Sequence, residues 1–443
     1  MAYGSIAFRY PQRPNELNEP KKRYSPQRSN PMKFENERRV VVTGAGVISA
    51  IGETMPDFSS SLFDGVCGIK ETNLFDTTGY TCRLGGQINS EKMNERLRPR
   101  QTKRISRCDL LGLIAAREAV LNAGIDFRQV DTERVGVIMG GGAGGMLSWE
   151  KFRREFWQGR KKRNPSRVLA SAPCTLTDLI ANHFGISGIR STITTACSSS
   201  ANAIGYGCDL IRSGDVDWVV TGGSEALSEL TFAGFNSLKV MSPEPCRPFD
   251  KHRRGLSLGE GAGILILEEY THALERGAFM LAEIAGYAVN ADAYHMTSPD
   301  PEALGMYRVM SSALEQSGIE VDKIDYINAH GTATKINDHM EARAIQRVFG
   351  EKNLQRITVS STKSMVGHCL GASGAIEAIA TVLALDQQAA PPTAHLDEPD
   401  SLCKLNHVAH SSREQNIRVA LSNSFAFGGN NTSLVFKRAD GEI

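Results

Sequence analysis

Short strand-like runs alternate with helix-periodic segments along most of the 443-residue chain. Strands are predicted where β-branched and other apolar residues cluster, over residues 135–139, 192–195, 218–221, 264–268, 326–329, 358–361, 418–422 and 434–437. Helices are predicted between them, for example over residues 110–123, 201–213, 306–318, 338–349 and 375–385. This alternation is typical of an α/β protein whose mainly parallel strands are covered by helices. The pattern runs twice, up to about residue 269 and again from about residue 282, without a visible sequence repeat.

The first buried strand begins at Arg39 and runs into the glycine-rich segment Gly44-Ala45-Gly46. This segment is similar to the GxGxxG pattern of dinucleotide-binding folds, but Ser49 stands where the third glycine belongs. A tight strand–helix turn is therefore favoured over a dinucleotide site. Residues 1–38 are polar and rich in proline, and they predict a disordered extension. Their acidic residues and the lack of an apolar stretch argue against a transit or signal peptide.

Composition excludes several classes of protein. The chain has 50 Lys and Arg against 49 Asp and Glu, with 41% hydrophobic and 22% charged residues. These values exclude disorder throughout and the global basicity of many nucleic-acid-binding proteins. The nine cysteines are scattered without disulfide-framework or metal-ligand spacing, and no run approaches the roughly 18 apolar residues of a membrane span. We therefore expect a reduced, cytoplasmic protein without a bound metal.

One cysteine is placed for chemistry. A β-branched strand, Ser191–Thr195, delivers Cys197 to the start of a predicted helix. The free N–H groups and the dipole of a helix N-terminus favour a thiolate and can hold an oxyanion. A buried structural cysteine remains the alternative when this segment is taken alone.

Three further segments carry reactive or mobile groups among small residues. His330 ends a predicted strand and is followed by the hydroxyls of Thr332 and Thr334, whereas His368 follows Lys363 in a second small-residue turn. A lone histidine is more often a core or surface residue, but two at strand ends favour a shared site. The segment Phe425–Asn431 places aromatics beside two glycines, and its alternative interpretation is a hairpin turn.

Together these four segments resemble the β-ketoacyl-[acyl-carrier-protein] synthases of the decarboxylating, type II-like branch, within the thiolase-like condensing enzymes. The resemblance covers residues 39–437, and further matches are Arg247–Asp250, Gly259–Gly263 and Asp292–Thr297. It implies a thiolase-like duplicated α/β fold, five-layered α-β-α-β-α with two mixed sheets. Residues 39–281 would form the half with the nucleophile, and residues 282–443 the half with the histidines and the lysine. The family also implies a homodimer.

The resemblance implies a two-stage reaction. Cys197 takes an acyl group from an acyl carrier protein, and the backbone N–H groups of Cys197 and Phe427 form the oxyanion hole. His330 and His368 then bind a malonyl thioester, whose decarboxylation leaves a carbanion that attacks the acyl-cysteine. The other implied roles are pantetheine contacts for Thr332 and Thr334, a substrate contact for Phe425, a gate for Phe427, and a Lys363–Glu341 pair that orients His368. No bound cofactor is implied, because the phosphopantetheine arrives on the carrier protein.

The chain departs from the family pattern near these motifs. Ala426 replaces a glycine of the gate segment, where it should restrict movement if the gate needs glycine conformations. The other departures are Asn430 for a threonine, Arg254 and Leu256 for an aspartate and a phenylalanine, and Lys335 for a proline. In the glycine loop 140–145, Gly142 and Ala143 match positions that line the acyl pocket, and Ala143 is smaller than the common aliphatic. We expect Ala143 to open the pocket to long or bulky acyl chains.

Carrier proteins are acidic, so a synthase needs a positive docking surface. Two basic clusters match regions where relatives dock their carrier: Arg98, Arg100, Lys103 and Arg104, and then Arg153, Arg154, Arg160, Lys161, Lys162 and Arg163. Solvated charge is the ordinary interpretation of such runs.

Four alternative functions are weaker. A polyketide or specialised-lipid ketosynthase would share the motifs, whereas a silent partner subunit would typically lack the nucleophile. A thiolase would need a second reactive cysteine, and Cys369 does not fit that pattern. An NAD-dependent enzyme is the most remote.

Overall fold

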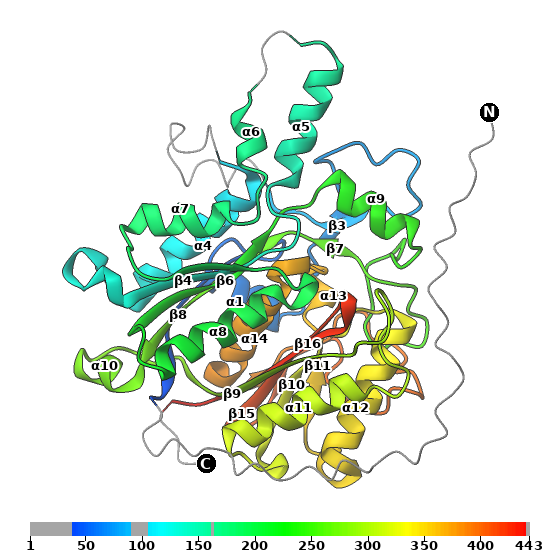
Figure 1. Cartoon of the computed structure of the whole chain (residues 1–443). Coiled ribbons are helices and arrows are strands. Elements are labelled where there is room, and N and C mark those ends of the chain that lie inside the picture. Colours follow the sequence, from blue (N-terminus) through cyan, green and yellow to red (C-terminus); the bar gives the residue numbers. More distant parts are fainter. Residues whose placement is uncertain (1–37, 90–104, 161–163, 440–443) are drawn as a thin grey trace, which may run out of the picture. The chain divides into compact units, whose positions relative to one another are not determined.

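The computed structural model describes residues 38–89, 105–160 and 164–439 (Figure 1). The residues from Arg38 onward form one compact unit. The extension expected over residues 1–38 lies outside the described residues except for Arg38. The proposed boundary between residues 281 and 282 falls at the start of strand β9. Within the described ranges, no helix is both long enough and apolar enough to cross a membrane.

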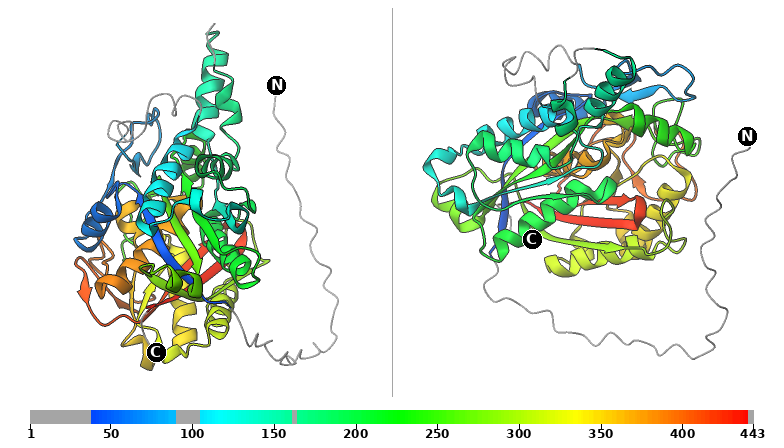
Figure 2. Two further views of the ribbon diagram at one scale, coloured as in Figure 1. Left: turned by 90° about the vertical axis from the view of Figure 1, so that its left-hand side faces the viewer. Right: turned by 45° about the horizontal axis from the view of Figure 1, so that its top comes forward.

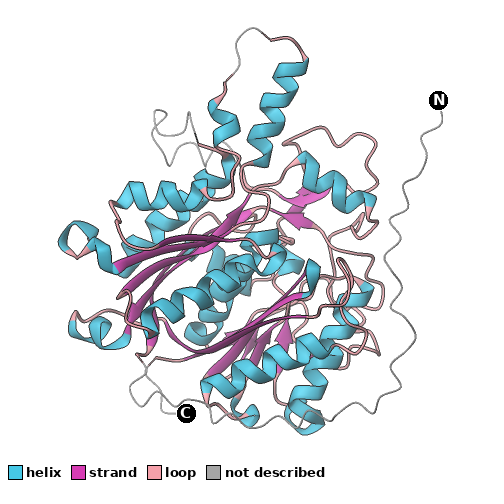
Figure 3. Ribbon diagram, in the orientation of Figure 1, coloured by secondary structure: helices cyan, strands magenta, loops and turns pink. Residues whose placement is uncertain are grey.

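An eleven-stranded sheet runs through the unit (Figures 1 and 3). Its strands, in spatial order, are β13 (Asn406–His407), β11 (Thr358–Ser360), β10 (Tyr326–Asn328), β15 (Val419–Ala426), β16 (Asn430–Lys437), β9 (Ala282–Ala291), β1 (Val40–Ile48), β8 (Gly261–Glu269), β6 (Trp218–Glu225), β4 (Val135–Gly140) and β5 (Arg190–Ile193). The two halves of this sheet meet where β1 pairs with β9 through Val41–Glu283 and Val42–Ala282. The two expected sheets are therefore joined by this short pairing.

The pairing of the strands is mixed. β13, β11, β10 and β15 are parallel at one end, and β6, β4 and β5 are parallel at the other. Every pairing between β15 and β6 in the spatial order is antiparallel. The expectation of mainly parallel strands is wrong, because β1, β8, β9 and β16 run back through the middle of the sheet. The α/β class itself is confirmed.

Helices cover both faces of the sheet and form its central layer. α4 (Arg107–Ala123) and α7 (Thr175–Phe184) lie on the outer face of the first half, and α11 (Leu304–Ser317) lies on that of the second, with α12 (Lys335–Leu354) beside it. α8 (Ser199–Arg212) and α14 (Ser373–Gln387) pack against each other between the two halves (Figure 3). This gives the five expected layers, α-β-α-β-α.

The glycine-rich segment near the start is a strand and not a turn. β1 continues through Gly44 and Gly46 to Ile48. A Cβ at Gly44 would lie 2.3 Å from the carbonyl oxygen of Ala119, and one at Gly46 would lie 2.1 Å from that of Ala115. The glycines therefore let α4 pack closely on the strand, which corrects the expected strand–helix turn.

The two central helices, α8 and α14, begin close to Cys197 and His368 in the chain. Residues 373–385 of α14 are buried all round, which fits an apolar helix enclosed between two sheet halves. α8 begins two residues after Cys197, and α14 begins five residues after His368. The duplicated architecture thus brings two equivalent helix starts to one place.

The remaining elements surround this core. The helices are α1 (Met55–Phe63), α5 (Met146–Trp157), α6 (Ser166–Leu169), α9 (Glu229–Ser237), α10 (Tyr270–Glu275) and α13 (Lys363–Val366), and the short strands are β2 (Ile69–Glu71), β3 (Leu84–Gly86), β7 (Leu258–Gly259), β12 (Ala389–Ala390) and β14 (Arg413–Glu414). α5 and α6 project from the layers in Figure 1 and in the left-hand view of Figure 2. This projection contains part of the basic stretch identified in the sequence.

Candidate active site

A cavity of about 440 Å³ brings the sequence-predicted residues together. Its lining includes the expected nucleophile, both histidines, the two threonines and both aromatics: Cys197, His330, Thr332, Thr334, His368, Phe425 and Phe427. These residues come from four separate segments of the chain and meet where β5, β10, α13 and β15 end. The prediction that the four segments form one site is consistent with this geometry.

Cys197 lies in a strained turn between β5 and α8. A 3-10 turn spans Ala196–Ser198, and α8 begins at Ser199. Ala196 has a φ of 52°, in the left-handed region that side-chain-bearing residues rarely adopt. The backbone N–H of Thr195 donates to the Ser199 hydroxyl over 2.9 Å, which ties the turn to the helix. The turn presents Cys197 to the cavity while leaving the residue only 6% exposed.

Burial acts against the thiolate form of Cys197. Burial raises its pKa to about 11, although Lys363 and the backbone N–H of Phe427 act in the opposite direction. Desolvation of the charged form thus acts against the thiolate that the start of a helix is expected to favour. The Phe427 N–H does point to the sulfur, in keeping with its expected place in the oxyanion hole.

The two histidines face each other in matching hydrogen-bonding states. Their rings lie 5.4 Å apart, at 86° to one another. The Lys363 ammonium donates to Nδ1 of His330 over 3.1 Å, and the Leu370 N–H donates to Nδ1 of His368 over 3.2 Å. A neutral imidazole that accepts at Nδ1 carries its hydrogen on Nε2. We therefore assign both rings as Nε2–H donors.

Burial keeps both imidazoles neutral. It lowers the pKa of His330 and of His368 well below the ordinary value, and the positive charge of Lys363 lowers both further. Each ring is at least 98% buried. Two neutral, buried donors suit the stabilisation of a developing oxyanion.

The partner of Lys363 is Glu377 of α14. The ammonium forms a short ion pair with Glu377 and also donates to the carbonyl of His330 over 2.6 Å. The expected Lys363–Glu341 pair is therefore wrong, because Lys363 pairs with Glu377. The histidine that Lys363 contacts is His330 and not the expected His368. The path of α14 places Glu377 at the ammonium, and the lysine side chain reaches back to the ring and carbonyl of His330.

Glu341 has a different role. Its carboxylate accepts the backbone N–H groups of His330 over 2.7 Å and of Gly331 over 2.8 Å. Burial raises the pKa of this carboxyl to about 7, against the effect of those two hydrogen bonds. Glu341 thus holds the turn that carries His330 and acts on the backbone instead of on Lys363.

The segment after β15 closes over the nucleophile. Phe427 stacks on Phe235 of α9, with ring centroids 5.7 Å apart and planes at 11°. The left-handed positions are Gly428 and Gly429, with φ of 82° and 72°. Ala426 is extended, with φ −102° and ψ 159°, so its side chain causes no strain in this conformation.

Hydrogen bonds tie this segment to the loop after β9. The Gly428 N–H donates to the carbonyl of Met296 over 2.7 Å, and the Asp292 N–H donates to that of Gly429 over 2.9 Å. The Asn431 amide donates to Asp292 Oδ1 over 2.7 Å. The Asn430 amide, which stands where the family has threonine, donates to the carbonyl of Phe427 over 3.3 Å. Both loops would have to move together if Phe427 swings out.

The glycine loop lies beside the site but does not line this cavity. The N–H groups of Gly142 and Ala143 donate to the Glu225 carboxylate over 2.9 and 3.0 Å, and the Gly371 N–H donates to the same group over 3.1 Å. Glu225 therefore joins the glycine loop to the turn that follows His368. That Ala143 widens an acyl pocket stays a prediction.

The carrier-docking residues fall mostly outside the described residues. These are Arg98, Arg100, Lys103, Arg104, Lys161, Lys162 and Arg163. Arg160 is exposed at the end of the projection, and Arg154 of α5 forms an ion pair with Glu229 over 2.6 Å. Carrier docking at these clusters stays a prediction.

Sequence reasoning missed three residues of the site. Glu377 is the one charged residue in the buried stretch 373–385 of α14, and such a group needs a partner, which is a signal that could have found it. Glu225, at the end of the buried strand β6, carries the same signal. Phe235 carries none, because an aromatic residue on a short helix is ordinary.

Comparison with known proteins identifies the family. The chain matches the model of the β-ketoacyl synthase N-terminal domain over residues 37–273 and that of the C-terminal domain over residues 281–397. It is 40% identical over 410 residues to 3-oxoacyl-[acyl-carrier-protein] synthase 2 of Synechocystis sp. (strain ATCC 27184 / PCC 6803 / Kazusa), covering 91% of this chain and 98% of that protein.

Solved structures give the same result. The ishigamide ketosynthase/chain length factor superposes with a TM-score of 0.85 at 34% identity, covering 91% of this chain and all of that one. The apo AntDE:AntF complex, a type II PKS acyl-carrier protein with its ketosynthase bound to the hexaketide, superposes with a TM-score of 0.84 at 31% identity over the same shares. With both domain models matched and a relative of this identity aligned over nearly its whole length, the chain belongs to the β-ketoacyl synthase family.

Proposed function

We propose that this protein is an elongating β-ketoacyl-[acyl-carrier-protein] synthase, an acyltransferase of fatty-acid or related biosynthesis. The observation that carries the proposal is one cavity that holds the Cys197 thiol and two neutral imidazoles with Nε2–H donors. Family membership and the name of the Synechocystis relative support it.

The first half-reaction transfers an acyl group to Cys197. The sulfur attacks the carbonyl of an acyl-carrier thioester, and the tetrahedral oxyanion takes the N–H groups of Cys197 and Phe427 as donors. Collapse breaks the bond to the carrier sulfur, so an acyl-cysteine forms and the thiol proton ends on the released carrier thiol. Because the resting thiol has a pKa of about 11, proton removal accompanies the attack.

The second half-reaction forms the carbon–carbon bond. The carbonyl oxygen of a malonyl thioester accepts hydrogen bonds from Nε2–H of His330 and His368. Loss of CO2 places the bonding electrons in an enolate, whose oxygen the two donors stabilise. The carbanion attacks the acyl-cysteine carbonyl and expels the Cys197 sulfur, which takes up one proton. The product is a β-ketoacyl chain two carbons longer on the carrier.

Acyl- and malonyl-loaded carrier proteins are the proposed partners. The names of the relatives include the carrier, and the AntDE:AntF complex contains one with its ketosynthase. The thioester arm is supplied by the carrier, so we propose that the protein needs no cofactor of its own. All nine cysteines are free, which supports the cytoplasm as its location.

Two alternative functions are compatible with the same fold. A ketosynthase of a polyketide or specialised-lipid pathway is the first, and the two ketosynthase structures described above support it. A silent partner subunit is the second, but it does not explain why Cys197, His330, His368 and Lys363 are all present in the described geometry.

The active form is proposed to be a homodimer. β5 is an edge strand of the sheet, with its outer side unpaired within the described residues. A second copy that pairs along β5 would cover this edge, and Ile189 just before it is 37% exposed. Sedimentation analysis of the full chain checks this, and a monomer at micromolar concentration would contradict it.

Mass spectrometry of the intact protein tests the function. Incubation with a panel of acyl-carrier thioesters should add one acyl group at Cys197, and malonyl-carrier should then release it as a β-ketoacyl product. Cys197→Ser should remove the adduct, whereas Cys174→Ser, which changes an exposed cysteine, should retain it. No acylation across the panel would overturn the proposal.

A further inference from the structure

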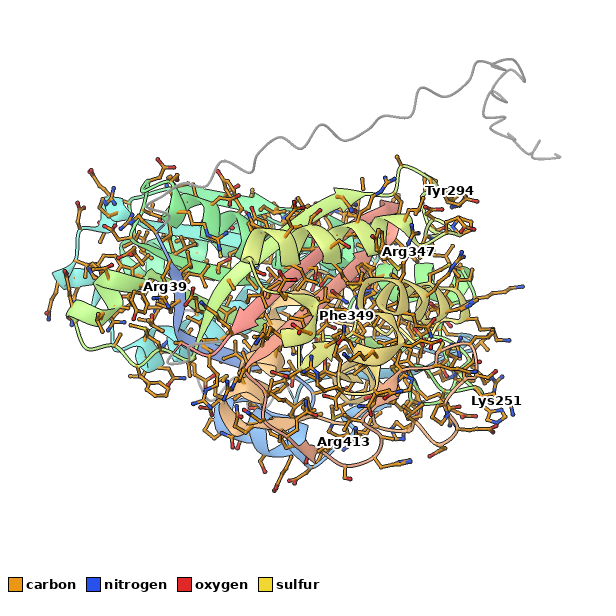
Figure 4. The ribbon with its side chains drawn as sticks, turned by 90° about the horizontal axis from the view of Figure 1, so that it is seen from below. Arg39, Lys251, Tyr294, Arg347, Phe349 and Arg413 are labelled. Carbon is orange, nitrogen blue, oxygen red and sulfur yellow. The ribbon has the colours of Figure 1, made fainter. Side chains whose placement is uncertain are left out.

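A second cavity opens beside the catalytic one and is lined by cationic and imidazole side chains. Its volume is about 420 Å³. The residues that line it are Lys251, His252, Arg253, Arg254 and Lys335. Arg254 and Lys335 also line the catalytic cavity, so the two cavities adjoin at these residues. Figure 4 shows Lys251 at the outer edge of the fold, on the side away from Arg39, so this cavity faces solvent.

Most of these charges are already neutralised. Arg253 is buried and pairs with Asp400 over 2.6 Å. Lys251 and His252 share the carboxylate of Glu398, over 2.6 and 3.1 Å. These three side chains therefore form the fixed wall of the cavity and have little charge left for a ligand.

Arg254 and Lys335 are the two cations left available. Arg254 has a side chain that is 62% exposed, and the one ion pair that it forms within residues 38–89, 105–160 and 164–439, with Glu244, is long at 3.7 Å. Lys335 is exposed and makes no ion pair with any residue in the described ranges. Surface pairs as long as the one to Glu244 are weak, so a phosphodiester, whose single negative charge is shared by two free oxygens, would compete well for both cations.

The position of the two cations relates them to the substrate arm. Lys335 follows Thr334 directly in the chain. The two threonines lie between His330 and Lys335 in sequence, and all four residues line the catalytic cavity. A pantetheine arm that reaches Cys197 past Thr332 and Thr334 has its phosphate at the opposite end from its thioester. That end must lie where the cavity opens.

We propose that Arg254 and Lys335 form a binding site for the phosphate group of the carrier protein's phosphopantetheine arm. The inference rests on the proposed function and adds a determinant of substrate binding to it. Both residues are departures from the family pattern, in which an aspartate and a proline are usual at these positions, so the site is a property of this chain. An aspartate at position 254 would repel the same phosphate.

The test compares two substrates that differ only in this phosphate. The pre-acylated enzyme is given malonyl-phosphopantetheine or malonyl-pantetheine, and kcat/KM is measured for each. The wild type should prefer the phosphorylated substrate at least about tenfold, the size of one charge-assisted hydrogen bond. In Arg254→Gln/Lys335→Gln this ratio should fall to about one. Arg128→Gln, which changes an exposed arginine paired with Asp126, should keep the wild-type ratio.

The other outcomes separate this inference from the function. Equal use of both substrates by the wild type would overturn the phosphate site but leave the synthase intact. Failure to turn over either substrate would overturn the proposed function itself. An equal loss on both substrates in the double variant would show a structural role and overturn the site. A loss with malonyl-coenzyme A but not with malonyl-carrier would overturn the assignment to the carrier.

Discussion

The Nζ atom of Lys363 lies 3.1 Å from Nδ1 of His330 and 2.6 Å from the carbonyl oxygen of the same residue. One buried ammonium therefore sets the ring tautomer of this histidine and also holds its backbone. Glu377 neutralises that ammonium, so the charge in the site is balanced before substrate enters. The histidine that faces the ammonium is thus prepared as a donor instead of a base.

The Lys363–Glu377 pair predicts that a second substitution partly restores the stability lost by the first. Lys363→Met should lower the free energy of unfolding by about 3–5 kcal/mol, because it leaves a buried carboxyl without its partner. Adding Glu377→Gln should recover part of this loss, since the second change removes the unpaired charge. Chemical denaturation of the single and double variants measures the coupling.

A matched control distinguishes the two candidate partners. Lys363→Met/Glu341→Gln should show no such recovery, because Glu341 binds the backbone of His330 and Gly331. Recovery with Glu341→Gln and none with Glu377→Gln would reverse the assignment.

The rate of the condensation half-reaction should be nearly independent of pH. The pKa values of His330 and His368 lie well below the ordinary value, so both rings stay neutral donors between about pH 6 and 8. Condensation of the pre-acylated enzyme with malonyl-carrier should therefore be nearly flat over this range. Rapid-quench measurement of each half-reaction checks it, and a condensation step that titrates near pH 6.5 would contradict the neutral assignment.

Glu225 should make folding stability fall as pH rises. Burial raises its pKa to about 7, so the folded state binds its proton more tightly than the unfolded state does. Its contribution is fully present below the unfolded pKa of about 4.5 and is lost as the pH passes 7. Glu225→Gln should remove on the order of 2 kcal/mol of this decline between pH 5 and 8.

Denaturant titrations at several pH values measure the slope for both proteins. Only the difference between them is diagnostic, because the neutral histidines favour the opposite slope below pH 6.5. Parallel slopes would show that Glu225 is ionised throughout.

Two substitutions in the segment after β15 should lower the free energy of unfolding by different amounts and for different reasons. Ala426 is extended, so Ala426→Gly should only lower stability, by about 0.5–1 kcal/mol through backbone entropy. Gly428→Ala should cost at least about 1–2 kcal/mol because φ is 82° there, and a Cβ would lie 3.0 Å from the Asn430 amide nitrogen. Thermal unfolding and turnover of both variants check this, and equal costs would contradict the observed backbone.

The sequence predicts the reactive groups of the site better than their environments. Cys197, His330 and His368 each follow a short strand or turn of small residues, and their order along the chain identifies the family. The partner of Lys363 depends on how two helices pack, because Glu341 and Glu377 are both buried carboxylates on helices. Spacing along the chain does not determine which of them reaches the ammonium.

The same limit applies to the fold. Alternating strands and helices predict the α/β class and the layers, because each apolar face must be covered. They do not predict the antiparallel strands in the middle of the sheet, since pairing direction depends on where the chain returns. Glycine serves both in tight turns and where two backbones pack closely, so Gly44 and Gly46 alone do not distinguish a turn from a strand. The position of α4 against them does.

The reactivity of Cys197 provides the last prediction. With a pKa of about 11, the thiol is ionised in only about one molecule in 1,000 at pH 8, so alkylation by iodoacetamide should be slow. Its rate should rise about tenfold per pH unit between pH 7 and 9, because the thiolate is the nucleophile. Lys363→Met should slow it further, since the ammonium lowers the pKa of this thiol.

Peptide mapping by mass spectrometry measures alkylation at each cysteine separately. The exposed Cys174 provides the internal comparison and should react first at every pH. If Cys197 were instead alkylated quickly at pH 7, with a rate that no longer rose up to pH 9, its thiolate would already be formed in the resting enzyme. The helix start would then outweigh burial, and acyl transfer would need no coupled proton removal.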